Sequence, residues 1–192
     1  MPVVISHVGT YAGTIVGTYV GLLRGDPVVH ATSGYVTMTS ATTGAFTVSL
    51  KMGGKAYSGS GKFDTNGLAV VQFTRPLPLP KLSLQLTQSS ASTVLQIHGR
   101  LTDGIISGAT ITGSTFVTEF TVDKVVWSST HKPTTFAGAY TLLMPAATTA
   151  PAEKAPLGTG YARMTINTTS GATAFSGKLA DGTAISASTT VS

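Results

Sequence analysis

The sequence predicts an all-β protein, an antiparallel meander of about 12 to 13 short strands that curves into a barrel-like sheet. Apolar and polar residues alternate strictly in many segments, as in 45–52, where four apolar side chains share one face. This alternation is typical of strands with one buried and one solvated face. No stretch has the i, i+3, i+4 apolar spacing of an amphipathic helix.

Strands are expected, in chain order, over 14–24, 33–41, 44–52, 55–63, 67–74, 81–89, 92–101, 104–112, 114–127, 136–144, 158–168, 171–179 and 182–189. The spacing of the turn residues between them is that of sandwiches and barrels. The segment 75–80 (RPLPLP) cannot donate a continuous hydrogen-bond ladder, so it is expected as an extended crossover. The segment 145–156, rich in Ala, Thr and Pro, is expected as a long surface loop.

Glycines on apolar faces favour a closed sheet. Gly59 and Gly61 alternate onto the same face as Tyr57 and Phe63, and Gly99 lies on a face that is otherwise apolar. Interior glycines allow the sharp bending and close backbone approach that curved sheets require. A barrel-like meander is therefore expected, with a two-sheet β-sandwich as the alternative.

One piece of sequence occurs twice. The segments 17–23 (GTYVGLL), 34–39 (GYVTMT) and 44–52 (GAFTVSLKM) return as 138–144 (GAYTLLM), 160–165 (GYARMT) and 171–179 (GATAFSGKL). Self-similarity of this kind indicates a duplicated structural module. The chain is expected to form a single domain, 1–192, built from two related repeats at about 14–133 and 134–192, the second one truncated.

A third, shorter echo lies between the two copies. The segment 99–104 (GRLTDG) is similar to 177–182 (GKLADG), and both end in Asp-Gly. Asp-Gly supplies the positive φ angles of a two-residue hairpin turn, so both segments are expected to form β-hairpins.

Composition excludes several classes of function. Lys and Arg outnumber Asp and Glu by 12 to 7, but the basic residues are dispersed, so nucleic-acid binding is not expected. No apolar run approaches the roughly 18 residues of a spanning helix, and membrane insertion is not expected. Cysteine is absent, which rules out disulfides and thiolate metal sites.

Catalytic constellations are also missing, so the protein is not expected to be an enzyme. No two histidines have local metal-ligand spacing, and neither a metal nor a cofactor is expected. Glu119 and Asp123 are the only close pair of acids outside turns. On a strand their Cα atoms lie roughly 13 Å apart, too far for the two carboxylates of a glycosidase.

Aromatic side chains are the remaining candidates for a binding site, because β modules often bind sugars by stacking on exposed rings. Tyr35, Tyr161 and Trp127, the only tryptophan, are the candidate ligand-binding residues. Tyr35 and Tyr161 occupy matching positions of the duplication, which also fits a packing role. For Trp127 we favour packing on the core over a binding platform.

These segments resemble a known family. The stretches 138–145 (GAYTLLMP), 158–161 (GTGY) and 177–183 (GKLADGT) look like the repeated β modules of very large bacterial secreted or cell-surface proteins. The segments 33–39, 44–46, 54–58 and 123–128 resemble the companion module. The resemblance implies a non-enzymatic structural or adhesive module, located outside the cell or on its surface, with neighbouring modules of a longer chain as partners. The alternative function is a carbohydrate-binding module that uses rim Tyr and Trp side chains.

The ends of the chain bear on this resemblance. The N-terminus has no basic n-region, so an exported protein is expected to contain this chain as an internal fragment of a longer precursor. In the family, further strands follow the 177–183 hairpin, whereas this sequence ends at Ser192. The apolar segment 2–6 is expected to pair beside a C-terminal strand and cover its edge.

Overall fold

A computed structural model describes residues 16–26, 28–76, 78–88, 96–146 and 158–191. Its described residues form fourteen strands and a single 3-10 turn, η1 (His30–Thr32). The all-β prediction is confirmed, and the chain divides into two compact units, 1–124 and 125–192. The expectation of a single domain stays a prediction, and segment 2–6 lies outside the described residues.

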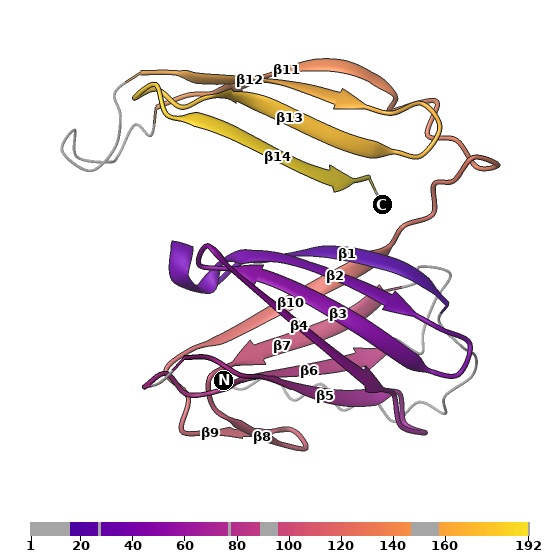
Figure 1. Cartoon of the computed structure of the whole chain (residues 1–192), viewed down its shortest axis with the longest axis vertical. Helices are drawn as coiled ribbons and strands as arrows, with labels where there is room; N and C mark the ends of the chain where they lie inside the picture. The colour runs from indigo at the N-terminus through magenta and orange to yellow at the C-terminus, as the bar shows by residue number, and fades with distance from the viewer. Residues whose placement is uncertain (1–15, 27, 77, 89–95, 147–157, 192) are drawn as a thin grey trace. The chain divides into compact units, whose positions relative to one another are not determined.

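The first unit is an antiparallel, barrel-like sheet with the order β4-β3-β2-β1-β10-β7-β6-β5 (Figure 1). Its strands are β1 (Gly17–Leu23), β2 (Gly34–Ser40), β3 (Ala45–Met52), β4 (Lys55–Lys62), β5 (Leu68–Phe73), β6 (Leu82–Gln88), β7 (Gln96–Thr102) and β10 (Val117–Lys124). The two end strands, β4 and β5, lie beside each other, so the sheet is nearly closed. The barrel-like form predicted from the sequence is therefore confirmed, and not the sandwich.

The inward faces of these strands make one hydrophobic core. Along β3 the alternation of the sequence becomes an alternation of burial, with Phe46, Val48, Leu50 and Met52 buried. On the opposite wall, β6 contributes side chains that are fully buried, including Leu84. Burial of this apolar surface is the main force that stabilises the closed sheet.

Glycines make room where the barrel closes. A Cβ atom at Gly59 would lie 2.6 Å from Val71 of β5, and one at Gly61 would lie 2.7 Å from Phe46. At Gly99 the ring of Phe120, its cross-strand neighbour, occupies the space of the missing side chain. These contacts explain why an apolar face carries glycine, as the sequence suggested.

The second unit is a four-stranded antiparallel sheet with the order β11-β12-β13-β14. Its strands are β11 (Gly138–Met144), β12 (Gly160–Ile166), β13 (Ala172–Lys178) and β14 (Ala184–Thr190). They pair in the same register as β1 to β4. Tyr140 lies opposite Met164 as Tyr19 lies opposite Met38, and Tyr161 lies opposite Lys178 as Tyr35 lies opposite Lys51.

The echo at 99–104 behaves differently from the prediction. The segment 177–182 makes the expected hairpin, with Gly182 at φ 85°. Gly104 does not have a positive φ, and the chain after it leaves β7 to form a separate two-stranded sheet, β8 (Ile105–Ser107) and β9 (Thr110–Thr112). The expected hairpin at 99–104 is therefore wrong, and the single strand expected over 104–112 is two strands joined at Gly108.

Candidate binding surfaces

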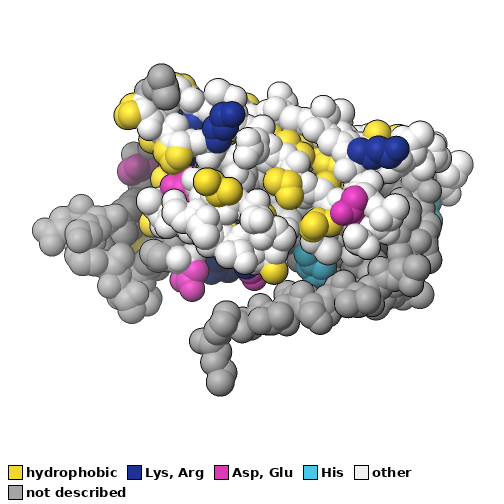
Figure 2. All heavy atoms as spheres, turned by 90° about the horizontal axis from the view of Figure 1, so that it is seen from below, with side chains coloured by type: hydrophobic (Ala, Val, Ile, Leu, Met, Phe, Trp, Pro, Cys, Tyr) yellow, Lys and Arg dark blue, Asp and Glu magenta, His cyan; other side chains and the backbone are white. Residues whose placement is uncertain are grey.

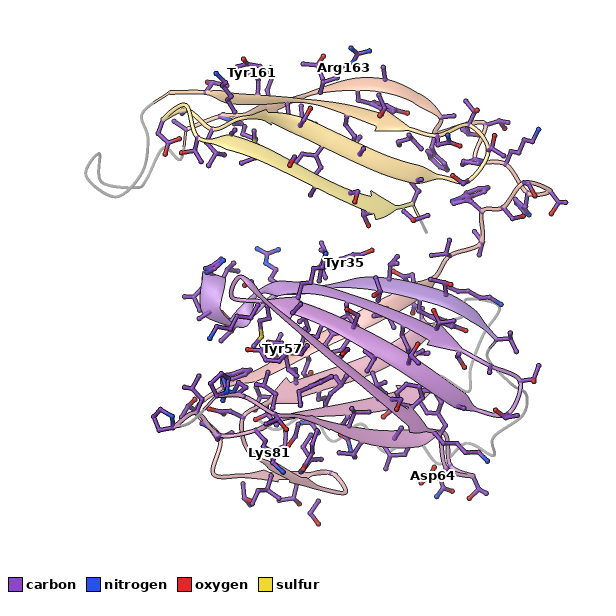
Figure 3. The ribbon with its side chains drawn as sticks, in the orientation of Figure 1. Tyr35, Tyr57, Asp64, Lys81, Tyr161 and Arg163 are labelled. Atoms are coloured by element: carbon purple, nitrogen blue, oxygen red, sulfur yellow. The ribbon has the colours of Figure 1, made fainter. Side chains whose placement is uncertain are left out.

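Tyr35 and Tyr161 lie on the outward faces of their sheets, with the same neighbours in both units (Figure 3). Leu22 and Lys51 lie across from Tyr35 on the adjacent strands, and Leu143 and Lys178 lie across from Tyr161. Tyr35 is half-buried, whereas Tyr161 is 56% exposed. The two leucines are 72% and 69% exposed, which places apolar surface beside each phenol ring and lysine. We call these two groups the Leu–Tyr–Lys triads.

A groove lies beside the triad of the first unit, on the outer face of β2, β3 and β4. It encloses about 450 Å³ and is lined by six hydroxyl side chains in two cross-strand rows. One row is Thr37, Ser49 and Ser58, and the other is Thr39, Thr47 and Ser60. Each hydroxyl both donates and accepts hydrogen bonds, so this surface suits a polyhydroxylated or hydrated ligand.

Trp127, the third candidate, packs within the second unit. Its ring stands edge-on to His131, with centroids 5.1 Å apart, and 6.2 Å from Phe136. It also covers the turn between β12 and β13, where a Cβ atom at Gly171 would lie 3.1 Å from the indole. These neighbours favour the packing role of Trp127 over a binding platform.

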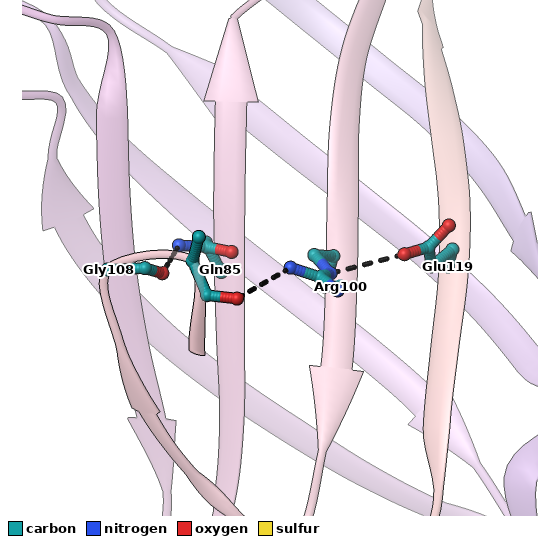
Figure 4. A network of polar contacts seen from close by, with 5 residues as sticks. Gln85, Arg100, Gly108 and Glu119 are labelled. Carbon is teal, nitrogen blue, oxygen red and sulfur yellow. Dashed lines mark hydrogen bonds and ion pairs between the residues drawn. The ribbon is translucent and has the colours of Figure 1, made fainter. Parts of the chain in front are cut away.

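Glu119 belongs to a row of polar side chains on the outside of the barrel (Figure 4). Arg100 lies across from both Gln85 and Glu119 on neighbouring strands, and its Nε is 3.2 Å from Glu119 Oε1. Gln85 Nε2 donates to the carbonyl oxygen of Gly108, in the turn of the β8–β9 hairpin, at 2.8 Å. The row therefore anchors this hairpin to the barrel wall and gives Glu119 a structural role.

The carboxylate of Asp103 accepts three hydrogen bonds. Its Oδ1 accepts from the backbone N–H of Thr115 at 2.8 Å and of Phe116 at 3.3 Å, and Oδ2 accepts from the Thr115 hydroxyl. Burial raises the pKa of Asp103, but these hydrogen bonds outweigh burial and hold the pKa below its ordinary value. Asp103 thus ties the end of β7 to the chain entering β10.

Other polar side chains on β7 and β10 have partners on the neighbouring strand. Asp123 accepts from Gln96 Nε2 at 2.7 Å, and His98 Nδ1 lies 3.2 Å from the Thr121 hydroxyl. Over the described ranges, no group of three or more His, Asp or Glu side chains gathers as a metal site would need. On the face shown in Figure 2, the Lys and Arg side chains are scattered and form no continuous basic patch.

The hydroxyl-lined groove is the feature that sequence reasoning missed. Thr and Ser are abundant throughout the chain, so their presence in 37–60 does not draw attention. The signal was their alternation with buried residues on three consecutive strands, which places every hydroxyl on the outer face.

No family model, curated protein or solved structure matches this chain. Among the described residues, no helix is long and apolar enough to cross a membrane.

Proposed function

We propose that this chain is a non-enzymatic structural or adhesive β module of an exported bacterial protein. The observation that carries the proposal is the shared register of β1–β4 and β11–β14. Two sheets that repeat one meander along one chain are typical of tandem modules, in which a structural unit is copied and not a reaction centre. The duplication read from the sequence is the simplest origin of that register.

The roles of the acidic side chains support this proposal. Asp64 and Asp181 accept backbone hydrogen bonds inside turns, from Asn66 and Thr183. Asp103 holds the connection that enters β10, and Glu119 forms an ion pair with Arg100 on the neighbouring strand. These roles stabilise loops and leave the carboxylates engaged with protein groups. A module that displays a rigid sheet needs such fixed turns.

Surface labelling of producing bacteria tests the proposal. An antibody raised against residues 16–191 is applied to intact and to lysed cells, with an antibody to a cytosolic enzyme as the control. Labelling of intact cells or of the culture medium is the expected result. Labelling that requires lysis, as for the cytosolic control, would refute an exported module.

Carbohydrate binding is the second candidate function, because the Leu–Tyr–Lys triads recur at the same register on both outer faces. A phenol ring flanked by an exposed leucine offers a stacking surface for a pyranose ring, and lysine and the neighbouring hydroxyls offer hydrogen bonds. The groove beside Tyr35 extends this surface in the first unit.

A glycan array with the unmodified protein and three variants tests this candidate. Tyr161→Ala and Tyr35→Ala are expected to reduce binding at least tenfold, each removing one stacking ring. Thr165→Ala is the matched control, since Thr165 shares the outer face of β12 with Tyr161 but lies two rows away. Absence of binding by the unmodified protein, or equal loss in the control, would eliminate the triads as sugar sites.

A further inference from the structure

The inner face of the second unit carries no charged side chain. We define this face by the side chains that alternate to one side of β11–β14: Tyr140, Leu142, Met144, Ala162, Met164, Ile166, Thr173, Phe175, Ile185, Ala187 and Thr189. Arg163 and Lys178 point to the opposite, outer face. Tyr140 is 39% exposed, and Leu142, Met164, Phe175 and Ile185 are half-buried.

The same positions in the first unit are buried by other strands. Tyr19, the counterpart of Tyr140, is fully buried, and so is Met38, the counterpart of Met164. Their cover comes from β5, β6, β7 and β10, which continue the sheet around the core. Within the second unit, the described residues provide four strands and no equivalent of these covering strands.

We propose that two copies of this chain associate through the inner faces of their second units, giving an assembly of eight strands. Four strands from each copy equal the eight of the first unit's sheet. A two-fold axis would place β11 beside β11 and β14 beside β14 of the second copy, both antiparallel. This inference concerns self-association and stands independently of the proposed function.

The edge strands favour this contact. Neither β11 nor β14 contains a charged residue or a proline, the features that usually prevent edge strands from pairing with another chain. Ala187 and Thr189 occupy the positions of Gly59 and Gly61, so β14 presents small side chains at the edge. Two uncharged faces can also meet without desolvating a charge.

The area of the two inner faces is close to that of a specific interface. Four strands about 4.8 Å apart and seven residues long, at about 3.4 Å per residue, span roughly 450 Å² of sheet. Two copies bury roughly 900 Å² when each face is treated as flat, near the roughly 1,000 Å² expected of a specific interface. The uneven surface of the side chains adds to this area. Edge-to-edge hydrogen bonds add to this contact.

Sedimentation velocity of the full 192-residue chain, from about 1 to 200 µM, tests the proposal. The expected result is a concentration-dependent dimer. Ala187→Lys, which places a charge on the inner face of β14, should weaken dimerisation at least tenfold. Ala174→Lys, which places the same charge on the outer face of the interior strand β13, should not weaken it. A monomer throughout the range, or equal effects of the two lysines, would overturn the proposal.

Hydrogen exchange on the unmodified chain keeps the test independent of variant folding. Amides of β11 and β14 should gain protection as concentration rises, because edge N–H groups become paired in the dimer. Protection that rises only within 16–124 would show that another surface associates, and would overturn the proposal.

Discussion

The two units begin from the same four-stranded meander and differ in what covers it. In the first unit the meander continues into β10, β7, β6 and β5, and its inner face becomes a closed core. In the second unit the described chain provides four strands alone. The pair Tyr19 and Met38 is buried, whereas the pair Tyr140 and Met164 keeps accessible surface. The comparison shows that register is set within a meander, while burial depends on the strands that follow.

Residues at matching positions of the two units differ in line with this difference in burial. Gly59 and Gly61 leave space for side chains from β5 and β3. Their counterparts in the second unit, Ala187 and Thr189, carry side chains because no such space has to be left there. Stability should therefore be concentrated in the first unit. The single tryptophan, Trp127, belongs to the second unit, so its fluorescence reports on that unit separately.

The largest effect is expected from Leu84→Ala in the core of the barrel. Leu84 is fully buried, and truncation at such a site costs about 3 kcal/mol of unfolding free energy. Urea unfolding followed by far-UV circular dichroism should show the loss, while the Trp127 fluorescence transition stays in place. Leu143→Ala, at an exposed position, is the control and should change stability by less than about 0.5 kcal/mol. A fluorescence midpoint that moves with the core mutation would mean that the units unfold together.

Asp103→Asn is expected to cost about 2 kcal/mol, because it removes a charge that accepts three hydrogen bonds. The pKa of Asp103 is lower in the folded state than its ordinary 3.8. Its contribution is therefore present above about pH 4 and is lost as the pH falls through the lowered value. Acid titration by circular dichroism should show this loss for the unmodified chain and not for the variant. Hydrogen bonds from Thr183 also lower the pKa of Asp181, in the exposed turn of the matching echo, so Asp181→Asn should change the acid transition in the same direction but by less.

The smallest effects on stability are expected from Tyr→Phe at the two matching tyrosines, and the two changes should have opposite signs. The Tyr19 hydroxyl is buried without a hydrogen-bond partner among the described residues, so Tyr19→Phe should stabilise the first unit by about 1 kcal/mol. Tyr140 donates to the Phe136 carbonyl at 2.6 Å, so Tyr140→Phe should destabilise the second unit by about 1 kcal/mol. Urea midpoints from dichroism and fluorescence, respectively, measure the two. Changes of the same sign would contradict the difference in environment.

Alkaline titration adds a check on Tyr19. Burial raises its pKa to about 12, from an ordinary value near 10. The folded state is therefore favoured below pH 10, and this contribution is lost as the pH rises from 10 towards 12. The Tyr19→Phe variant should lack that part of the alkaline loss.

Strand positions could be predicted from the sequence because alternation is a local property. The expected segment 44–52 contains β3, and 171–179 contains β13, with bounds within two residues. Closure could not be predicted in detail, since the pairing of Tyr19 with Lys124 joins residues far apart in the chain. The Asp-Gly pattern failed at 103–104 because contacts with Thr115 and Phe116 determine the conformation there.

For the candidate surfaces too, local features could be predicted from the sequence and contacts between distant segments could not. The repeat identified Tyr35 and Tyr161 as equivalent, and the structure gives them equivalent cross-strand neighbours. The packing of Trp127 on the turn at Gly171 depends on a contact between distant segments, which alternation does not encode. The hydroxyl-lined groove required three strands to be placed side by side before its rows became visible.

The pairing of β1 with β10 has a consequence for synthesis on the ribosome. Strand β4 ends at Lys62 and β10 ends at Lys124, so 62 further residues (124 − 62) must be made before the barrel can close. At roughly 5 to 20 residues per second this takes about 3 to 12 s. For that time the nascent chain can present β1–β4 as an open meander, in the form that the second unit keeps. The first unit thus passes, while it is being made, through a stage when its future core is open to chaperones and to other nascent chains.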